Sequence, residues 1–306
     1  MFLKTIVRRY FCLVLFAVLT LLVACSDHRD AAVTTFSLSS PARIAALDSD
    51  TLLITDFGAN KFCTVDKLSL QIVNCFSAKG KPTGIAYADY KGGRYFVGNR
   101  SVRSVDMFDS HGSFIGHLGG GTGLFGLVND LAINRADGSV YVLDSKAAIV
   151  SIYDFDGRLV VKDFTPGGLD NPSALSLGPD GKVYISDFGT ADDFNDQSIK
   201  IFDKTGVLID SILSGGSSFK SPAFTSPQGL FIDGSSNIFM ADSGLGTIFI
   251  YDSSFTFIKN VGERGSEPGQ LFYPLGLFVD EVSRNIFISD NRNGRVTVLL
   301  GAGVVP

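Results

Sequence analysis

An aspartate-rich segment is the clearest candidate for metal chemistry in this chain. It reads DFGTADDFNDQS and spans residues 187–198. The segment holds the carboxylates of Asp187, Asp192, Asp193 and Asp196 and the amide of Asn195. Oxygen ligands of this kind suit hard cations, so the four aspartates are a candidate Ca²⁺ site. Their spacing differs from that of an EF-hand loop, and a solvated polar loop is the alternative interpretation.

Aspartate also recurs at one position of a repeated phrase. Two copies, PQGLFIDGSSNIFMADSG (227–244) and PLGLFVDEVSRNIFISDN (274–291), are nearly the same. The aspartates that end the second apolar run of such phrases are Asp56, Asp144, Asp187, Asp242 and Asp290. Of these, Asp187, Asp242 and Asp290 are candidates for ligand contacts. The competing interpretation is that each recurring aspartate caps nearby backbone amides.

Six copies of the phrase divide the chain into repeats. They begin at Pro41, Pro82, Asn129, Pro172, Pro227 and Pro274, between 41 and 55 residues apart. Two apolar runs joined by a turn rich in Asp and Gly are followed by segments that alternate apolar and polar residues, which is the periodicity of β-strands. Four antiparallel strands repeated at about 45 residues are typical of propeller blades. The sequence therefore predicts an all-β, six-bladed β-propeller of four-stranded antiparallel blades.

The two ends of the chain together complete one blade. The sixth repeat stops after three strands, whereas AVTTFSL (32–38) alternates as a strand does and precedes the first repeat. Because an unpaired strand edge promotes aggregation, we expect this N-terminal strand to close the last blade. The expected propeller domain is 32–306, with blades at about 41–80, 81–123, 124–169, 170–225, 226–272, and 273–306 plus 32–38.

The last two repeats resemble the NHL repeat. The resemblance is carried by VGERGSEPGQLFYPLGLFVD (261–280) and by NIFISDNRNGRVTVL (285–299). It extends over about residues 41–300, although the second repeat reads FVGNR and lacks the recurring aspartate. The resemblance implies the same six-bladed propeller.

The loops that leave the second and fourth strands gather on one face of such a propeller, around its channel, and binding sites favour such loops. The fourth repeat departs from the others on this face. Besides the aspartate-rich insertion it has a long exit, SGGSSFKSPAFTSP (214–227), and we expect Phe219 and Phe224 to overhang the channel. We therefore predict a binding or scaffold module for an envelope protein, a peptide or a glycan.

Some proteins with this repeat or ring are lyases or lactonases that carry a metal, so enzymatic activity is the alternative. The histidines here are His28, His111 and His117, and the glutamates are Glu263, Glu267 and Glu281. Zinc needs three or four converging ligands, and we place His111 and His117 beside a hairpin away from the loop face. No GxSxG nucleophile motif occurs. A metal-dependent lyase or lactonase-like hydrolase with an Asp/Asn-based site at the channel mouth remains the second hypothesis.

The N-terminus carries the pattern of an export signal. Lys4, Arg8 and Arg9 precede an apolar run that ends in LVAC at Cys25. This ending resembles the lipobox of bacterial lipoproteins, which implies a signal peptide at 1–24, lipid on Cys25 and a tether at 25–31. Ser26 after that cysteine implies the outer membrane, facing the periplasm, in a host with two membranes. The net charge of −5 gives no electrostatic footprint for nucleic acid.

Two further cysteines, Cys63 and Cys75, lie on consecutive predicted strands of the first repeat, at equal distances from Ser69 in the loop between them. This symmetry places them opposite each other across a hairpin. Because an exported protein meets an oxidising environment, we expect a structural disulfide, with two free thiols as the alternative.

Overall fold

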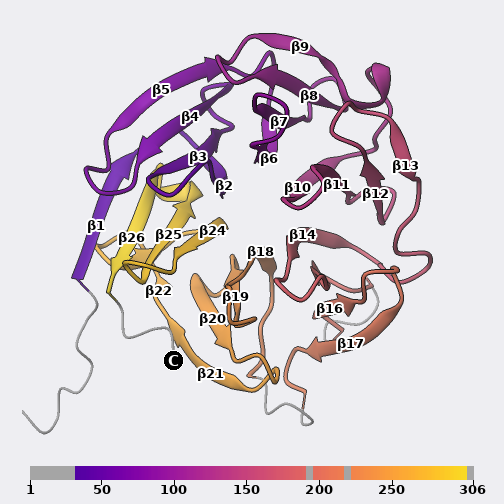
Figure 1. Ribbon diagram of the computed structural model, residues 1–306. Helices are drawn as coiled ribbons and strands as arrows, with labels where there is room; N and C mark the ends of the chain where they lie inside the picture. Colours follow the sequence, from indigo (N-terminus) through magenta and orange to yellow (C-terminus); the bar gives the residue numbers. More distant parts are fainter. Residues whose placement is uncertain (1–31, 191–195, 217–221, 302–306) are drawn as a thin grey trace, which may run out of the picture. The chain divides into compact units, whose positions relative to one another are not determined.

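Six four-stranded antiparallel sheets form a ring in the computed structural model of this protein (Figure 1). The structure describes residues 32–190, 196–216 and 222–301. The predicted six-bladed, all-β propeller is confirmed. In every blade the first strand lies toward the middle of the ring and the fourth strand lies at its periphery (Figure 1).

The blades follow one another along the chain. Blade 1 contains β2 (Pro41–Ala46), β3 (Thr51–Asp56), β4 (Lys61–Asp66) and β5 (Ile72–Ser77); blade 2 contains β6 (Pro82–Ala88), β7 (Arg94–Asn99), β8 (Ser104–Asp109) and β9 (Phe114–His117); blade 3 contains β10 (Val128–Asn134), β11 (Ser139–Asp144), β12 (Ile149–Tyr153) and β13 (Leu159–Val161). Blade 4 contains β14 (Pro172–Leu177), β15 (Val183–Asp187), β16 (Ser198–Phe202) and β17 (Leu208–Leu213); blade 5 contains β18 (Pro227–Ile232), β19 (Ile238–Asp242), β20 (Thr247–Tyr251) and β21 (Phe257–Val261). Blade 6 contains β24 (Pro274–Asp280), β25 (Asn285–Asp290) and β26 (Arg295–Leu300), and a short parallel pair, β22 (Glu263–Arg264) and β23 (Gln270–Leu271), precedes it.

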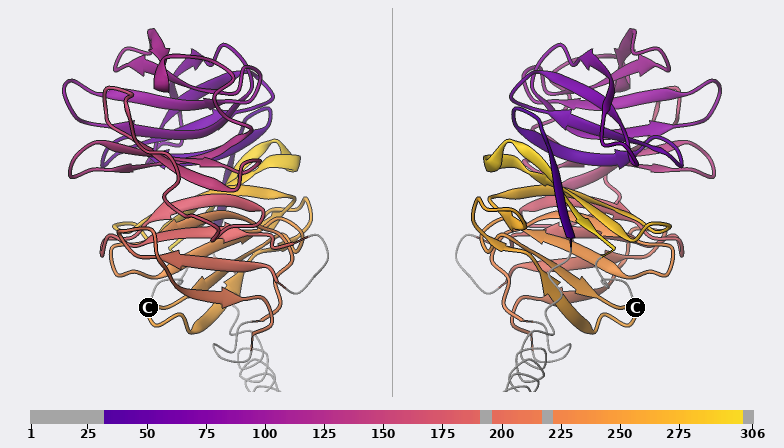
Figure 2. Two further views of the ribbon diagram at one scale, coloured as in Figure 1. Left: turned by 90° about the vertical axis from the view of Figure 1, so that its right-hand side faces the viewer. Right: turned by 90° about the vertical axis from the view of Figure 1, so that its left-hand side faces the viewer.

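The N-terminal strand closes the ring. β1 (Ala32–Ser37) pairs with β26 and becomes the outermost strand of blade 6. Just beyond β1, the backbone N–H of Leu38 donates to the carbonyl of Gly294 at 3.0 Å. Figure 2 shows β1, in indigo, alongside the yellow strands of the C-terminal blade. The predicted closure is confirmed, and it leaves both ends of the propeller domain in one sheet.

The hydrophobic core lies between the blades. The five clusters of buried apolar side chains in the described residues each combine two neighbouring blades. Between blades 1 and 2, for example, the Phe62 ring lies 5.4 Å from that of Tyr95 and 5.1 Å from that of Phe108, centroid to centroid. Each repeat therefore buries its apolar face against the next repeat, which explains why the same phrase recurs.

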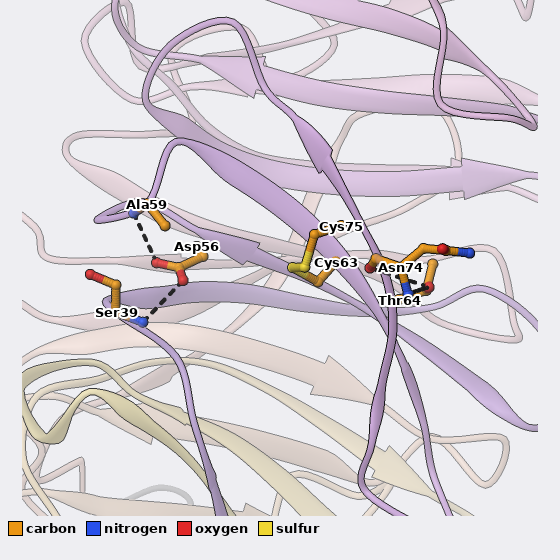
Figure 3. The surroundings of a disulfide bond; sticks show 7 residues. All are labelled: Ser39, Asp56, Ala59, Cys63, Thr64, Asn74 and Cys75. Carbon is orange, nitrogen blue, oxygen red and sulfur yellow. Dashed lines mark hydrogen bonds between the residues drawn. A yellow bond between two sulfur atoms is a disulfide. The ribbon is translucent and has the colours of Figure 1, made fainter.

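Cys63 on β4 and Cys75 on β5 lie opposite each other in the antiparallel pairing. They form a disulfide across the hairpin, next to the Thr64–Asn74 pair (Figure 3). The bond fastens the outer strand of blade 1, whose side chains are mostly exposed, to the buried strand beside it.

Loss of this disulfide is expected to destabilise the propeller without altering its loop face. Replacing both residues by serine (Cys63→Ser with Cys75→Ser) should lower the free energy of unfolding by about 2–4 kcal/mol, because the unfolded chain gains conformational freedom. Urea denaturation followed by circular dichroism would measure the loss. A reductant should then have no further effect on the double variant. Equal midpoints for the oxidised and reduced wild-type chain would contradict the prediction.

Several predicted residues lie outside the described ranges: Cys25, Asp192, Asp193, Asn195 and Phe219. Within those ranges, no helix is both long enough and apolar enough to cross a bilayer.

Candidate functional site

The aspartates that end the second strands are buried and bonded to the backbone. Asp56, Asp144, Asp187, Asp242 and Asp290 are each at most 4% exposed. Each carboxylate accepts at least one backbone N–H from the loop that leads into the first strand of its own blade. In blade 1, Asp56 accepts from Ser39 on that loop and from Ala59 in the following turn (Figure 3). It also accepts the backbone N–H of Ser40. The capping interpretation is thus confirmed for these five aspartates.

The carboxylates that were candidates for ligand contacts are already bonded to groups of the protein itself. Asp187 binds three amides and also lies 3.1 Å from the Lys200 ammonium. Burial acts to lower the pKa of Lys200, but the hydrogen bond that its ammonium donates to Asp170 and the charge of Asp187 outweigh it and raise that pKa. Asp290 similarly pairs with Arg295 at 2.8 Å. Ligand contacts through Asp187, Asp242 and Asp290 stay a prediction.

Only part of the predicted calcium site can be placed. Asp196 Oδ2 accepts the backbone N–H and the hydroxyl of Thr190, at 2.7 and 2.8 Å. The backbone bond from Thr190 is the main reason that the pKa of Asp196 lies below its usual value. No group of three His, Cys, Asp or Glu side chains suited to a metal ion occurs among residues 32–190, 196–216 and 222–301. The cation site stays a prediction, because Asp192 and Asp193 lie outside those ranges.

The prediction that Phe224 overhangs the channel is wrong. Its side chain is 1% exposed and packs on Phe249, with ring centroids 6.0 Å apart. It belongs to the cluster between blades 4 and 5. Burying a phenyl ring is worth about 1.5–3 kcal/mol, so the long exit of blade 4 folds this ring inward instead of presenting it to solvent.

The prediction that His117 lies away from the loop face is also wrong. His117 is the last residue of β9, and its Nδ1 lies 2.8 Å from Asp106 Oδ1. The same carboxylate binds Nδ2 of Asn99, which stands where the other blades carry their recurring aspartate. The fourth strand has returned to the loop-face end of the blade by residue 117, which brings the imidazole to that end. This network replaces the aspartate cap in blade 2 and therefore has a structural role.

A central pocket of about 660 Å³ lies on the loop face and takes residues from all six blades. The second residue of every first strand contributes: Ala42, Thr83, Asn129, Ser173, Gln228 and Leu275. The residue that follows the second strand contributes in five blades: Phe57, Arg100, Ser145, Phe188 and Asn291. Equivalent positions of the repeat therefore build one pocket, and the side chain at each position varies among the blades.

A buried ion pair lies at the pocket floor. Arg43 is 7% exposed, and its Nε lies 3.3 Å from Asp130 Oδ2 in blade 3. Its guanidinium also donates to the carbonyl of Ser173 at 2.6 Å and to that of Leu275. Burial raises the pKa of Asp130 above its usual value, while the charge of Arg43 opposes that rise. One side chain thus links blades 1, 3, 4 and 6 across the channel.

Small residues at the same position of the other blades leave room for this pair. The third residue of the first strand is Gly84, Ala174, Gly229 or Gly276 there. A Cβ on Gly84 would come within 2.8 Å of Asp130 Cα, and one on Gly276 within 2.6 Å of the Ala42 carbonyl oxygen. The first strands therefore converge so closely that only blades 1 and 3 carry a side chain larger than a methyl group at this level.

Amides, aromatic rings and cations form the walls and rim. Asn129 Nδ2 donates to the Ser173 carbonyl at 2.6 Å, and Asn291 Nδ2 donates to Pro41 O at 2.9 Å. At the rim, the Arg292 guanidinium lies 5.4 Å from the centre of the Tyr273 ring. Arg100 and Arg292 are both exposed. Among the residues that the structure describes, the pocket lining contains three arginines and no carboxylate or imidazole.

Sequence reasoning located the loop face but missed the pocket. The sequence-based candidates were the recurring aspartates, whereas the pocket is lined by residues at positions that vary among the blades. The usable signal was the third residue of each first strand, which is glycine or alanine in four blades but Arg43 and Asp130 in the other two. A charged pair in place of small residues at one structural position indicates a contact across the ring.

No protein-family model and no curated protein matches the sequence. Solved structures do share its architecture. A gluconolactonase from Xanthomonas campestris superposes with a TM-score of 0.66 at 17% identity, covering 89% of this chain and 90% of that one. A nutrient-binding protein from Bacteroides thetaiotaomicron gives 0.64 at 13% identity (86% and 69%), and virginiamycin B lyase from Staphylococcus aureus gives 0.56 at 13% (85% and 82%). Identities this low establish architecture only, and by architecture the chain is a six-bladed β-propeller.

Proposed function

We propose that this chain is an exported, lipid-anchored propeller of the NHL type that acts as a non-catalytic binding module in the cell envelope. Its ligand, a peptide, a glycan or a segment of an envelope protein, enters the central pocket. The lipobox-like LVAC at Cys25 supports the anchor, and the NHL-like phrases of blades 5 and 6 support the repeat type. The nutrient-binding structural neighbour is a precedent for binding on this architecture.

One observation carries the proposal. The pocket of about 660 Å³ has the size of a small-molecule or short-peptide site, and every blade lines it with a residue from an equivalent position. At the same time, the recurring aspartates nearby are turned to backbone amides. Variable side chains on a repeated frame are typical of a recognition surface.

A metal-dependent lyase or lactonase-like hydrolase is the second candidate, because a lactonase and a lyase are among the structural neighbours. Such chemistry would need carboxylate or imidazole ligands at the channel mouth. The pocket lining offers amide and hydroxyl oxygens and arginines instead, which suit the binding of a polar molecule better than the retention of a cation. The binding function is therefore placed first.

Photo-crosslinking in the native host tests the proposal. A photoreactive side chain in place of Tyr273, on the pocket rim, is expected to capture an envelope component, because a bound ligand passes this residue. The same group in place of Pro179, which lines a hollow on the turns joining first to second strands, is the matched control. Mass spectrometry would identify the adduct.

The anchor is tested in the same cells. With Cys25→Ala, the chain should leave the membrane fraction and the Tyr273 adduct should disappear, because the lipid no longer holds the pocket near its ligand. Equal adducts from both positions, or membrane retention of Cys25→Ala, would contradict the proposal.

A further inference from the structure

The three arginines of the pocket come from three consecutive blades. Arg292 follows the second strand of blade 6, Arg43 lies on the first strand of blade 1, and Arg100 follows the second strand of blade 2. Blades 6, 1 and 2 are neighbours in the ring (Figure 1). Arg100 and Arg292 therefore lie in the two blades that flank blade 1, whereas the Arg43 guanidinium reaches across the floor of the pocket to blades 3, 4 and 6.

Among the described residues, the opposite side of the pocket is uncharged and combines polar side chains with Leu127, Pro172 and Phe188. Blades 3, 4 and 5 contribute Asn129, Asn171, Ser173 and Gln228 to the lining. Asn171 and Gln228 present amide groups, which bind neutral donors and acceptors, whereas the buried Ser173 hydroxyl is bonded to the Pro227 carbonyl and the Ser186 hydroxyl. The lining is thus divided into a cationic half and a neutral half, although the whole chain has more acidic than basic residues, 31 against 26.

The charges of the three arginines are not equivalent. Asp130 neutralises Arg43 at the floor, so this guanidinium contributes position and donors but little net charge. No acidic residue pairs with Arg100 or Arg292 among the ion pairs of the described residues. Stacking on Tyr273 holds Arg292 at the rim. Arginine stays protonated at any physiological pH and matches the planar geometry of an oxyanion.

We propose that the pocket selects a small ligand that carries a carboxylate or a phosphate group. The oxyanion lies between Arg100 and Arg292, and the uncharged polar body of the ligand lies against blades 3 to 5. This inference rests on the proposed binding function and adds the chemical class of the ligand. The capping aspartates around the channel oppose an anion at long range, so direct contacts with these two arginines must supply the affinity.

Calorimetric titration of the purified full-length chain with three matched probes tests the proposal. Glucose, glucuronate and glucose 6-phosphate share one polar body and differ in a single substituent, which is neutral, a carboxylate or a phosphate. We expect at least one of the two anions to bind at least tenfold more tightly than glucose, since a charge-assisted hydrogen bond is worth about 1.5–3 kcal/mol. The relative affinities of the two anions distinguish a carboxylate site from a phosphate site.

Variants assign the effect to the two arginines. Arg100→Gln and Arg292→Gln should each weaken anion binding about tenfold, and the double variant about a hundredfold, because each removes one charged donor. Arg135→Gln, an exposed arginine in a hollow formed by turns between first and second strands, is the matched control and should change nothing.

The outcomes separate this inference from the binding function. Glucose binding as tightly as both anions, or anion binding that survives the double variant, would overturn the anion selectivity and leave a binding pocket in place. No heat from any anion at about 10 mM, where even millimolar dissociation constants are detected, would also overturn it. The crosslinking of Tyr273 would then still report on the binding function by itself.

Discussion

Replacing Arg43 with methionine is expected to lower the free energy of unfolding by about 3–5 kcal/mol, because the change strands a buried carboxylate. Arg43 is the only ion-pair partner of Asp130 among the described residues, at 3.3 Å. Its guanidinium also binds the Ser173 and Leu275 carbonyls, so the variant removes a link among four blades. Methionine keeps the length and the apolar stem. The chain has no tryptophan, so urea unfolding would be followed by circular dichroism and tyrosine fluorescence.

A second variant distinguishes the stranded charge from a general packing defect. Adding Asp130→Asn to Arg43→Met removes the uncompensated charge but keeps an acceptor for the backbone N–H of Leu175, which Asp130 binds at 3.1 Å. More than half of the lost stability should return, since the penalty arises mainly from one buried, unpaired ion. A double variant as unstable as Arg43→Met alone would contradict the electrostatic explanation.

The same pair predicts a dependence on pH with a definite sign. Burial already raises the pKa of Asp130 in the wild-type chain, and the charge of Arg43 limits that rise. A carboxyl whose pKa is raised by folding favours the folded state while it is protonated, and this contribution is lost as the pH rises through the folded-state pKa. In Arg43→Met that pKa rises further. The stability difference from wild type should therefore be smaller at pH 4.5 than at pH 7.5, and a pH-independent difference would contradict the prediction.

The architecture was predictable because it depends on local patterns that recur. Alternating apolar residues, turns rich in Asp and Gly, and a repeat of about 45 residues all favour the same four-stranded unit. The leftover strand at residues 32–38 then identified the closure with β26, since a sheet edge needs a partner. The capping role of residues such as Asp56 was predictable for the same reason. An aspartate at the end of a strand binds nearby amides whatever the rest of the fold does.

The pocket could not be predicted in this way because it depends on contacts between distant blades. Arg43 and Asp130 meet only after the ring is closed, and within PARIAALDSD an arginine between alanine and isoleucine resembles an ordinary solvent-facing residue. The prediction that Phe224 is exposed was wrong for a related reason. Its position in a long polar loop suggested exposure, whereas the space between blades 4 and 5 offered a buried site that only the three-dimensional packing reveals.

His117 illustrates how one departure from the repeat accompanies another. Blade 2 lacks the recurring aspartate, and Asn99 at that position cannot carry a negative charge. The charge appears instead on Asp106 of the adjacent strand, where it binds Asn99 and His117. The sequence contained each of these residues, but only the pairing of β7, β8 and β9 brings them together.

The capping aspartates lead to the second large expected effect. Asp242→Ala should lower the free energy of unfolding by about 3 kcal/mol or more. The carboxylate accepts four backbone N–H groups at 2.5 to 3.2 Å, from Thr225, Ser226, Gly244 and Leu245. Each buried donor left without an acceptor costs about 1–3 kcal/mol before water reaches it. Thermal and urea denaturation would measure the change.

The control for Asp242→Ala is Asp137→Ala. Asp137 is an exposed turn aspartate whose side chain accepts one backbone N–H, from Ser139 at 2.9 Å, so its loss should cost no more than about 1 kcal/mol. Asp242→Asn should fall between the two, because its amide keeps one acceptor oxygen but turns a donor toward N–H groups that need an acceptor. If Asp242→Ala and Asp137→Ala were equally stable, the recurring aspartates would not be what fastens each first strand to its blade, and their repetition would need a function in binding after all.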